Sequence, residues 1–399
     1  MSEYRFMNQL IEKEHIPTPA YVFDLDKMKE FAEKVKRCLT GKAEICYAMK
    51  ANPFLIKPML EIVSSLEVCS PGEFRICERA GIPMEKIVLS GVYKNPDDIA
   101  YMLDTYGNRG TYTVESLQHL EVLNDTAVRH GITLSVLIRV TSGNQFGIDE
   151  AEIRKIISER EKYTGIEIEG IQFYSGTQKR NLSQMQEELK HLDTFIRELE
   201  EIGGMEIRTL EYGPGFFVPY FVKDKSERTE DLLEEFKKIL EALQFHGKIV
   251  LEMGRLLAAS CGYYITSIVD MKVNKEQPYA ILDGGINHLN YYGQAMAMKR
   301  PYCSQLNSKG SEKTEGKEEN WNLCGALCTV SDVIVKQFPL RNPKICDILV
   351  FERVGAYSVT EGIYLFLSRP LPKIYFWTQA DGLHLVRDGI HTDILNSEN

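Results

Sequence analysis

The sequence lacks the features of a membrane, nucleic-acid-binding or disulfide-bonded protein. No run approaches the ~20 apolar residues that span a bilayer, and residues 1–14 are polar, without the apolar core of a secretion signal. The net charge of −10, with no basic stripe, argues against a nucleic-acid partner. Nine cysteines without paired spacing indicate reduced thiols and a cytoplasmic protein. Cys324 and Cys328 lack a second Cys/His pair, so no metal site is expected.

Apolar runs alternate with amphipathic helical stretches about eight times, a pattern typical of a (β/α)₈ TIM barrel. The predicted strands are Ile45–Ala48, Leu66–Cys69, Lys86–Ser90, Gly110–Val114, Thr133–Val140, Ile168–Tyr174, Thr209–Tyr212 and Ile249–Glu252. Because alternation does not reveal closure, a doubly wound open sheet is the alternative. The length of 399 residues leaves room for a second domain.

After residue 257 the pattern changes to β-branched and aromatic runs with few long helices, which indicates an all-β domain. Its predicted strands are Tyr263–Lys272, Ala280–Leu282, Ala326–Val335, Asp347–Phe351 and Lys373–Trp377. We expect a barrel over 25–257 and a β domain made of 1–24, whose strand joins it, plus 258–399. The nearly all-polar stretch 304–320 is expected to be a mobile surface loop.

Polar and glycine motifs gather where the barrel strands end, which is where TIM barrels place their active sites. Lys50 ends the first barrel strand, where desolvation favours a neutral amine able to form a Schiff base. A surface lysine closing a strand is the plainer reading, and the later strand ends decide against it.

Those later ends combine a Gly-Thr pair at Thr177, glycines at Gly213 and Gly215, and the Gly254-Arg255 pair. Together they make a cradle of backbone N–H groups and a guanidinium that suits a phosphate. A lysine, this cradle and the strand-end carboxylate of Glu252 together predict pyridoxal 5′-phosphate as the cofactor. Glu252 would keep the pyridine nitrogen protonated, so that the ring acts as an electron sink.

Six motifs occur in an order that resembles the pyridoxal-phosphate decarboxylases of the alanine-racemase fold, the group of diaminopimelate and ornithine decarboxylases. They are Tyr-Ala-Met-Lys-Ala-Asn (47–52), Glu-Met-Gly-Arg (252–255), Asp-Gly-Gly (283–285), Gly-Ala-Leu-Cys (325–328), Gly-Ala-Tyr (355–357) and Leu-Ser-Arg-Pro (367–370). The resemblance implies a barrel plus a β domain and a homodimer with shared active sites. It also implies that Cys328 reaches the partner's site to protonate the α-carbon and that Tyr357 contacts the phosphate.

The chain departs from this family pattern where substrate is recognised. Tyr174 replaces the histidine that stacks on the cofactor ring, and a phenol can also stack. Thr329 follows the catalytic cysteine where diaminopimelate decarboxylases place a glutamate, and residues 286–290 lack their arginine. The distal charges of diaminopimelate would then lie unpaired. Burying unpaired charges costs roughly several kcal/mol of binding free energy.

Tyr-Ser-Gly-Thr-Gln (174–178) and the residues after the glycine turn resemble a branch that decarboxylates glutamyl groups on acyl-carrier proteins, together with siderophore-pathway enzymes. We therefore expect decarboxylation of an amino acid or a carrier-protein-bound aminoacyl group, with Thr329, His288 and Tyr357 as substrate contacts. A small uncharged side chain fits the same features. The alternatives are diaminopimelate decarboxylation, racemisation and a catalytically inactive regulatory homologue, although Lys50 and Cys328 are both present.

Three further polar residues at strand ends have weaker functional interpretations. Glu67 and Glu73 flank the second strand end and could order Lys50, although a helix N-terminal carboxylate explains Glu73 equally well. Arg139 could orient the stacking residue or form a plain ion pair.

Overall fold

The computed structural model describes residues 7, 10–12, 16–225 and 227–398. The chain divides into two compact units. The unit that we call the barrel unit comprises Lys29–Phe217 and Glu227–Leu257. The other, the β unit, comprises Met1–Met28, Val218–Ser226 and Ala258–Asn399.

The barrel unit contains eight parallel strands that close into a barrel, because the first strand, β2, pairs with the last, β9. This confirms the predicted TIM barrel over the open sheet. The strands are β2 (Glu44–Ala48), β3 (Ser65–Val68), β4 (Ile87–Leu89), β5 (Thr111–Val114), β6 (Leu134–Val140), β7 (Ile166–Tyr174), β8 (Thr209–Gly213) and β9 (Lys248–Met253).

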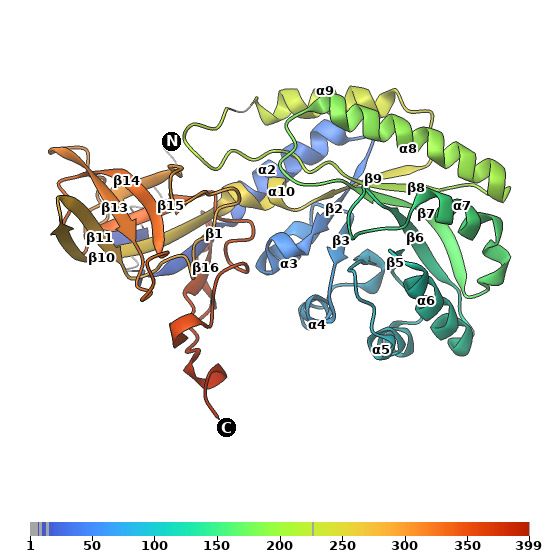
Figure 1. Cartoon of the computed structure of the whole chain (residues 1–399), viewed down its shortest axis with the longest axis horizontal. Helices are drawn as coiled ribbons and strands as arrows, with labels where there is room; N and C mark the ends of the chain where they lie inside the picture. The colour runs from blue at the N-terminus through green and yellow to red at the C-terminus, as the bar shows by residue number, and fades with distance from the viewer. Residues whose placement is uncertain (1–6, 8–9, 13–15, 226, 399) are drawn as a thin grey trace. The chain divides into compact units, whose positions relative to one another are not determined.

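Helices cover the outside of these strands, with α4, α5 and α6 along one side and α8 and α9 along another (Figure 1). They are α2 (Leu25–Leu39), α3 (Ile56–Leu60), α4 (Pro71–Ala80), α5 (Pro96–Tyr106), α6 (Leu117–His130), α7 (Glu150–Ser158), α8 (Leu182–Gly203), α9 (Thr229–Glu241) and α10 (Arg255–Ala258). Side-chain caps start several of them: Ser70, Asn95 and Ser116 accept hydrogen bonds from backbone N–H groups of the first turn. These three helices begin just after β3, β4 and β5, at the carboxyl end of the barrel.

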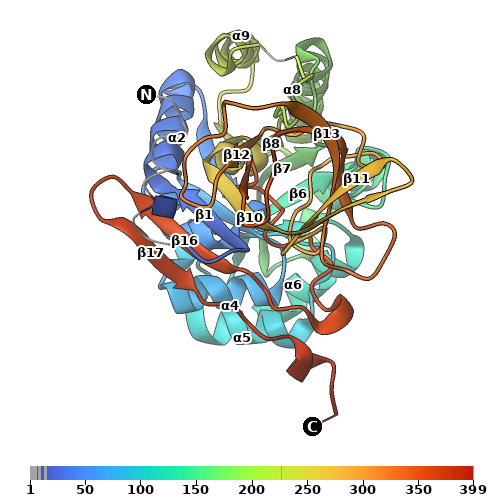
Figure 2. The same ribbon diagram turned by 90° about the vertical axis from the view of Figure 1, so that its left-hand side faces the viewer.

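The β unit is built on a nine-stranded, mostly antiparallel sheet, whose β16 and β17 lie side by side in Figure 2. Strand β1 lies between β10, to which it is antiparallel, and β16, to which it is parallel. The strands are β1 (Ala20–Asp24), β10 (Gly262–Asn274), β11 (Gln277–Leu282), β12 (Cys303–Leu306), β13 (Glu318–Cys324), β14 (Val333–Arg341), β15 (Ile348–Glu352), β16 (Lys373–Thr378) and β17 (Gly382–Arg387).

One prediction for the β unit was wrong, and the bounds of the predicted loop were too wide. Residues 326–331, predicted as the start of a strand, form a loop, and β14 begins only at Val333. The polar stretch 304–320 is not one open loop, because its ends belong to β12 and β13. Its middle is anchored by Lys313, whose Nζ lies 2.6 Å from Oδ2 of the buried Asp347. The ion pair between Lys313 and the buried Asp347 therefore holds this polar segment against the sheet.

The segment Val218–Ser226 belongs to the β unit, although the predicted boundaries placed it in the barrel. Phe221 forms a β-bridge with Pro301, and the Val222 N–H donates to the Arg300 carbonyl at 2.9 Å. These backbone contacts explain the grouping, which the strand–helix repeat could not reveal.

Candidate active site

Lys50 lies at the carboxyl end of β2, in the single 3₁₀ turn Met49–Ala51 that follows the strand. Its Nζ lies 2.7 Å from Oε2 of Glu67 on β3 and 3.3 Å from Oε1 of Glu252 on β9. The two glutamate side chains are only 2% and 9% exposed. Because β2 pairs with both β3 and β9, the closed barrel brings this lysine and two carboxyl groups together.

The two carboxyl groups differ in their affinity for a proton. Burial raises the pKa of Glu252 well above its usual range, and the negative charge of Glu67 raises it further. Burial also opposes ionisation of Glu67, but the charge of Lys50 and hydrogen bonds from Lys50 and Glu252 outweigh it and lower the pKa of Glu67. The cluster therefore holds an ionised Glu67, facing Lys50, and a protonated Glu252.

A third buried carboxyl group, Glu211 on β8, was missed by the sequence analysis. Its Oε1 accepts a hydrogen bond from Gln172 Nε2 at 2.6 Å, and Gln172 also contacts the Ser90 hydroxyl at 3.3 Å. Burial, with the negative charge of Glu67, raises the pKa of Glu211 to about 7. An acidic residue inside an otherwise apolar strand was the available signal, since parallel barrel strands are normally apolar throughout.

The predicted phosphate cradle is formed by turns that lie against one another. Arg255, the first residue of α10, donates from Nε to the hydroxyl of Thr177 at 3.2 Å. Gly215 has φ of +58°, and a side-chain carbon there would lie 2.0 Å from the Gly176 carbonyl oxygen. At Gly254 an added carbon would lie 2.9 Å from the Ala48 carbonyl oxygen. These glycines are needed for close approach of backbone to backbone.

Tyr174 ends β7, and its ring rests on the next strand end at Gly213. An added carbon at Gly213 would lie 2.5 Å from Cδ2 of the tyrosine ring. Burial and the negative charge of Glu252 raise the pKa of the Tyr174 phenol. The half-buried ring therefore remains neutral and offers a flat face beside the glutamate cluster.

Two other strand-end residues that the sequence singled out have defined partners. Arg139 on β6 donates from Nη1 to Glu115 at 3.1 Å, and its guanidinium lies 4.8 Å from the centre of the Phe146 ring. Glu73 on α4 accepts the Cys69 N–H at 2.7 Å, so it holds the end of β3. Both residues organise strand ends of the barrel unit.

The remaining predicted residues lie on loops of the β unit. Cys328 and Thr329 lie in the loop between β13 and β14, where the Cys328 side chain is exposed. Asp332 shapes this loop: its buried carboxylate accepts the Leu327 N–H at 2.8 Å and the Ile286 N–H at 2.9 Å. The sequence analysis did not single out Asp332.

Tyr357 follows β15 and has φ of +69°, which is rare outside glycine. Backbone groups hold this turn, since Thr360 and Glu361 both donate to the Tyr357 carbonyl.

His288, predicted as a substrate contact, is 3% exposed. Its Nδ1 lies 3.0 Å from the Tyr264 hydroxyl, and its Nε2 lies 3.1 Å from the Pro370 carbonyl. Burial lowers the pKa of His288 to about 4, so the ring is neutral. These contacts favour a structural role within the β unit.

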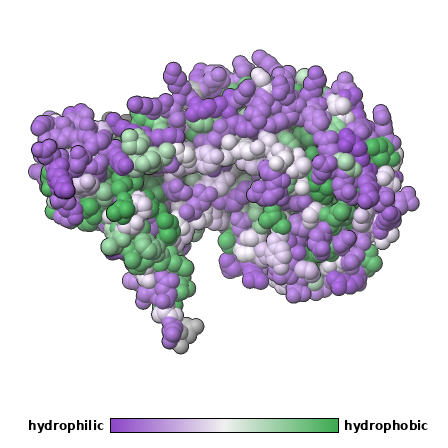
Figure 3. Space-filling view, viewed as in Figure 1, coloured by the Kyte–Doolittle hydropathy of each residue, from purple (hydrophilic) through white to green (hydrophobic). Residues whose placement is uncertain are grey.

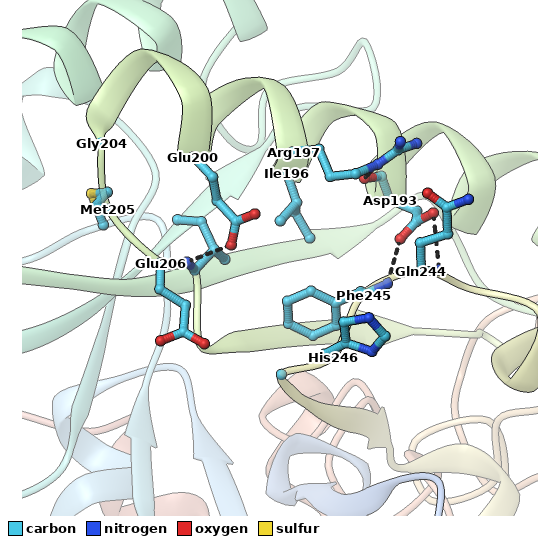
Figure 4. A pocket seen from close by; sticks show the side chains of 12 residues that line it. Asp193, Ile196, Arg197, Glu200, Gly204, Met205, Glu206, Gln244, Phe245 and His246 are labelled. Atoms are coloured by element: carbon cyan, nitrogen blue, oxygen red, sulfur yellow. Dashed lines mark hydrogen bonds between the residues drawn. The ribbon is translucent and has the colours of Figure 1, made fainter.

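A pocket of about 500 Å³ lies at the opposite, amino-terminal end of β8 and β9 (Figure 4). Its carboxylates are already used, because Asp193 accepts the Gln244 and Phe245 N–H groups and Glu200 accepts the Ile207 N–H. None of the predicted site residues lines it. The carboxyl ends of the strands therefore remain the candidate active site.

A comparison with protein families decides the assignment. A family described as "Pyridoxal-dependent decarboxylase, pyridoxal binding domain" matches residues 25–259, more than half of the chain. The chain belongs to this decarboxylase family. It is therefore a carbon–carbon lyase of the carboxy-lyase type, and its cofactor is pyridoxal phosphate.

The curated relatives of this decarboxylase act on more than one substrate. The diaminopimelate decarboxylase of Aquifex aeolicus is 28% identical over 86% of this chain and 82% of its own length. The L-glutamyl-[BtrI acyl-carrier protein] decarboxylase of Niallia circulans is 24% identical over 89% of this chain and 87% of its own. Identities this close together do not distinguish the two substrates.

A solved structure shows the same fold over nearly the whole decarboxylase chain. Diaminopimelate decarboxylase from Helicobacter pylori, complexed with L-lysine, superimposes with a TM-score of 0.83 at 25% identity, covering 96% of each chain. Within the part of this chain that the structure describes, no helix combines the length and the hydropathy that crossing a membrane requires.

Proposed function

We propose that Lys50, Glu67 and Glu252 form the catalytic centre of this pyridoxal-phosphate decarboxylase. The observation that carries the proposal is the placement of one lysine against two buried carboxyl groups at the carboxyl end of the barrel. The pKa of one carboxyl group is lowered and that of the other is raised. When bound, pyridoxal phosphate supplies an electron sink that accepts the electron pair of the broken bond between Cα and the carboxylate.

The chain's own residues fit this cofactor. Lys50 Nζ is the point of covalent attachment, and the ionised Glu67 holds the lysine side chain in place. The protonated carboxyl of Glu252 holds a proton for the pyridine nitrogen. Thr177, Gly215 and Arg255, brought together by the two turns and α10, bind the phosphate. Tyr174 would supply a flat face for the cofactor ring.

We further propose that the enzyme is a homodimer in which Cys328 returns the proton to Cα in the partner's site. The Cys328 side chain is exposed, and Val330, two residues along, is 99% exposed. Other large apolar residues of the β unit are exposed as well: Met296, Met298, Ile363, Leu365, Phe366, Leu367, Ile394 and Leu395. Figure 3 shows apolar surface towards the C-terminal end of this unit. Apolar surface of this extent suits an interface.

For the substrate, we propose an amino acid or a carrier-bound aminoacyl group that lacks the distal charge pair of diaminopimelate. Thr329, which follows Cys328, offers a hydroxyl that contacts Ser331 at 2.9 Å instead of a carboxylate. The segment 286–290 carries no arginine, and its Asn287 and His288 are buried. Arg369 lies against the cysteine loop and donates to the Ala326 carbonyl at 2.9 Å.

Diaminopimelate is the second candidate, because the Aquifex and Helicobacter relatives named above are diaminopimelate decarboxylases. The two candidate substrates require different groups in the pocket. A diaminopimelate site needs partners for a distal ammonium and a distal carboxylate, whereas an aminoacyl thioester needs an open exit for its tail. Arg369 is the cation that a distal carboxylate could use.

The test is a substrate panel with the pyridoxal-phosphate-loaded enzyme. It contains meso-diaminopimelate, lysine, ornithine, glutamate and glutamyl groups linked as thioesters to a carrier protein, and CO₂ release is followed by mass spectrometry. We expect turnover of a substrate without the distal charge pair. A kcat/KM for diaminopimelate far above all others would overturn the substrate proposal and leave the catalytic centre intact.

A further inference from the structure

Lys179, in the loop between β7 and α8, is a buried lysine that the decarboxylation chemistry does not use. It is 9% exposed, and its Nζ lies 2.7 Å from Oε2 of Glu188 on α8 and 2.8 Å from the Ser175 hydroxyl. Burial lowers the pKa of Lys179, while Glu188 opposes this effect. Burying an ion pair carries a desolvation cost that surface pairs avoid, so we expect the Lys179–Glu188 pair to have a specific geometric role.

The backbone of Lys179 connects the two turns that carry Thr177 and Gly215. Its N–H donates to the Gly215 carbonyl at 2.8 Å, and its own carbonyl accepts the Phe217 N–H at 3.1 Å. A parallel β-bridge between Lys179 and Phe216 results. The spacing of the two phosphate-binding turns therefore depends on where Lys179 is held.

Glu188 fixes that position from the first turns of α8. Its Oε2 also accepts the Tyr212 hydroxyl at 2.5 Å, and its Oε1 accepts the Ser175 hydroxyl at 2.7 Å. Burial opposes ionisation of Glu188, but hydrogen bonds from Lys179, Tyr212 and Ser175 outweigh it and lower its pKa. The carboxylate thus joins the helix, the end of β8 and both ends of the loop segment 175–179.

We propose that Lys179 and Glu188 are positioning residues that set the spacing of the two turns and thereby the affinity for the phosphate of pyridoxal phosphate. The inference rests on the proposed assignment of Thr177 and Gly215 to the phosphate site. Directional hydrogen bonds are required for this role, because an apolar side chain would fill the same space without fixing Ser175 or the loop backbone.

The test compares binding of pyridoxal phosphate with binding of pyridoxal, which lacks the phosphate. Apoenzyme is prepared for wild type, Lys179→Met, Glu188→Gln and the double variant Lys179→Met/Glu188→Leu, which leaves no lone buried charge. Ser175→Ala removes one hydroxyl and serves as the mildest variant. Lys162→Met is the matched control, because it breaks an exposed ion pair of similar length, 2.6 Å, to Glu159. Dissociation constants come from equilibrium dialysis.

We expect the Kd for pyridoxal phosphate to rise about 10- to 100-fold in the single and double variants, the range for a lost charge-assisted hydrogen bond, and about 3- to 10-fold in Ser175→Ala. The Kd for pyridoxal should change less than about twofold, as should both constants in the control. The kcat at saturating pyridoxal phosphate should stay near that of wild type. If the two residues had a merely structural role, their replacement would raise the Kd for both ligands alike.

The outcomes separate this inference from the proposed function on which it rests. If wild type prefers pyridoxal phosphate over pyridoxal but the double variant and Ser175→Ala keep that preference, the positioning role is wrong. An equal loss of both ligands also contradicts it. If wild type itself binds the two ligands equally, the assignment of Thr177 and Gly215 to the phosphate fails first, and the positioning role fails with it.

Discussion

Replacing Glu211 with glutamine should stabilise the apoenzyme, and only at neutral to alkaline pH. Burial, with the charge of Glu67, raises the Glu211 pKa from its ordinary value of 4.5 to about 7. The folded protein therefore keeps this proton over a pH range in which the unfolded chain has lost it. The contribution of Glu211 to the free energy of unfolding therefore falls as the pH rises from 4.5 to about 7, and it stays constant at higher pH.

The size of the effect follows from the two pKa values. A tenfold change in proton affinity corresponds to about 1.4 kcal/mol, so ionisable Glu211 costs about 3 kcal/mol at pH 8 and less than about 1 kcal/mol at pH 5. Glutamine cannot ionise and still offers an oxygen to Gln172 Nε2. With a urea m-value of about 3 kcal/mol per M, Glu211→Gln should raise the midpoint by about 1 M at pH 8.

The unfolding signal can be chosen to report the barrel unit. Its helices dominate far-ultraviolet circular dichroism, whereas both tryptophans, Trp321 and Trp377, lie in the β unit and report that unit by fluorescence. Glu121→Gln, on an exposed position of α6, is the control. A midpoint shift of equal size at pH 5 and pH 8 would refute the raised pKa of Glu211.

Three further predictions concern catalysis. Glu252→Gln should retain the cofactor, seen as unchanged absorbance stoichiometry, but lower kcat at least ~100-fold, because an unprotonated pyridine accepts electrons poorly; unchanged turnover would remove Glu252 from its role. Gly215→Ala should weaken cofactor binding about tenfold or more in dialysis, because its added carbon meets the Gly176 carbonyl oxygen at 2.0 Å; wild-type affinity would show that the turns can separate freely. Mixing inactive Lys50→Ala and Cys328→Ala subunits should restore roughly a quarter of wild-type activity, since random exchange makes about half the dimers mixed, each with one complete site; no recovery after mass-verified exchange would place both residues in one chain's site.

The barrel could be predicted because its strands are buried on both faces and read as continuous apolar runs. Strand β8, for example, is buried at every position and was predicted to within one residue. The β unit was harder. Strand β13 begins with exposed residues at Glu318 and Glu319, and the edge strand β17 is half-buried or exposed at every position, so neither reads as a buried strand.

The chemistry at the barrel strand ends was predictable residue by residue, but its electrostatics were not. Lys50 and Glu252 lie at strand ends that the sequence identifies, although barrel closure decides that they meet. The role of Gln172 depends on Glu211, which is 39 residues away, and the role of Lys179 depends on Glu188, which is 9 residues away. A sequence shows that such residues exist, and only the packed barrel shows that they are buried together.

The most direct test of the proposed catalytic centre is to find the lysine that carries the cofactor. Among the described residues of the barrel unit, Lys94 and Lys179 are the two buried lysines, and Lys50 is one of the half-buried ones. The enzyme loaded with pyridoxal phosphate is reduced with borohydride, digested and mapped by mass spectrometry. We expect the pyridoxyl mass on the peptide that contains Lys50, with Lys94 and Lys179 unmodified. A stoichiometric label on Lys94 or Lys179, with Lys50 free, would contradict the catalytic centre proposed here.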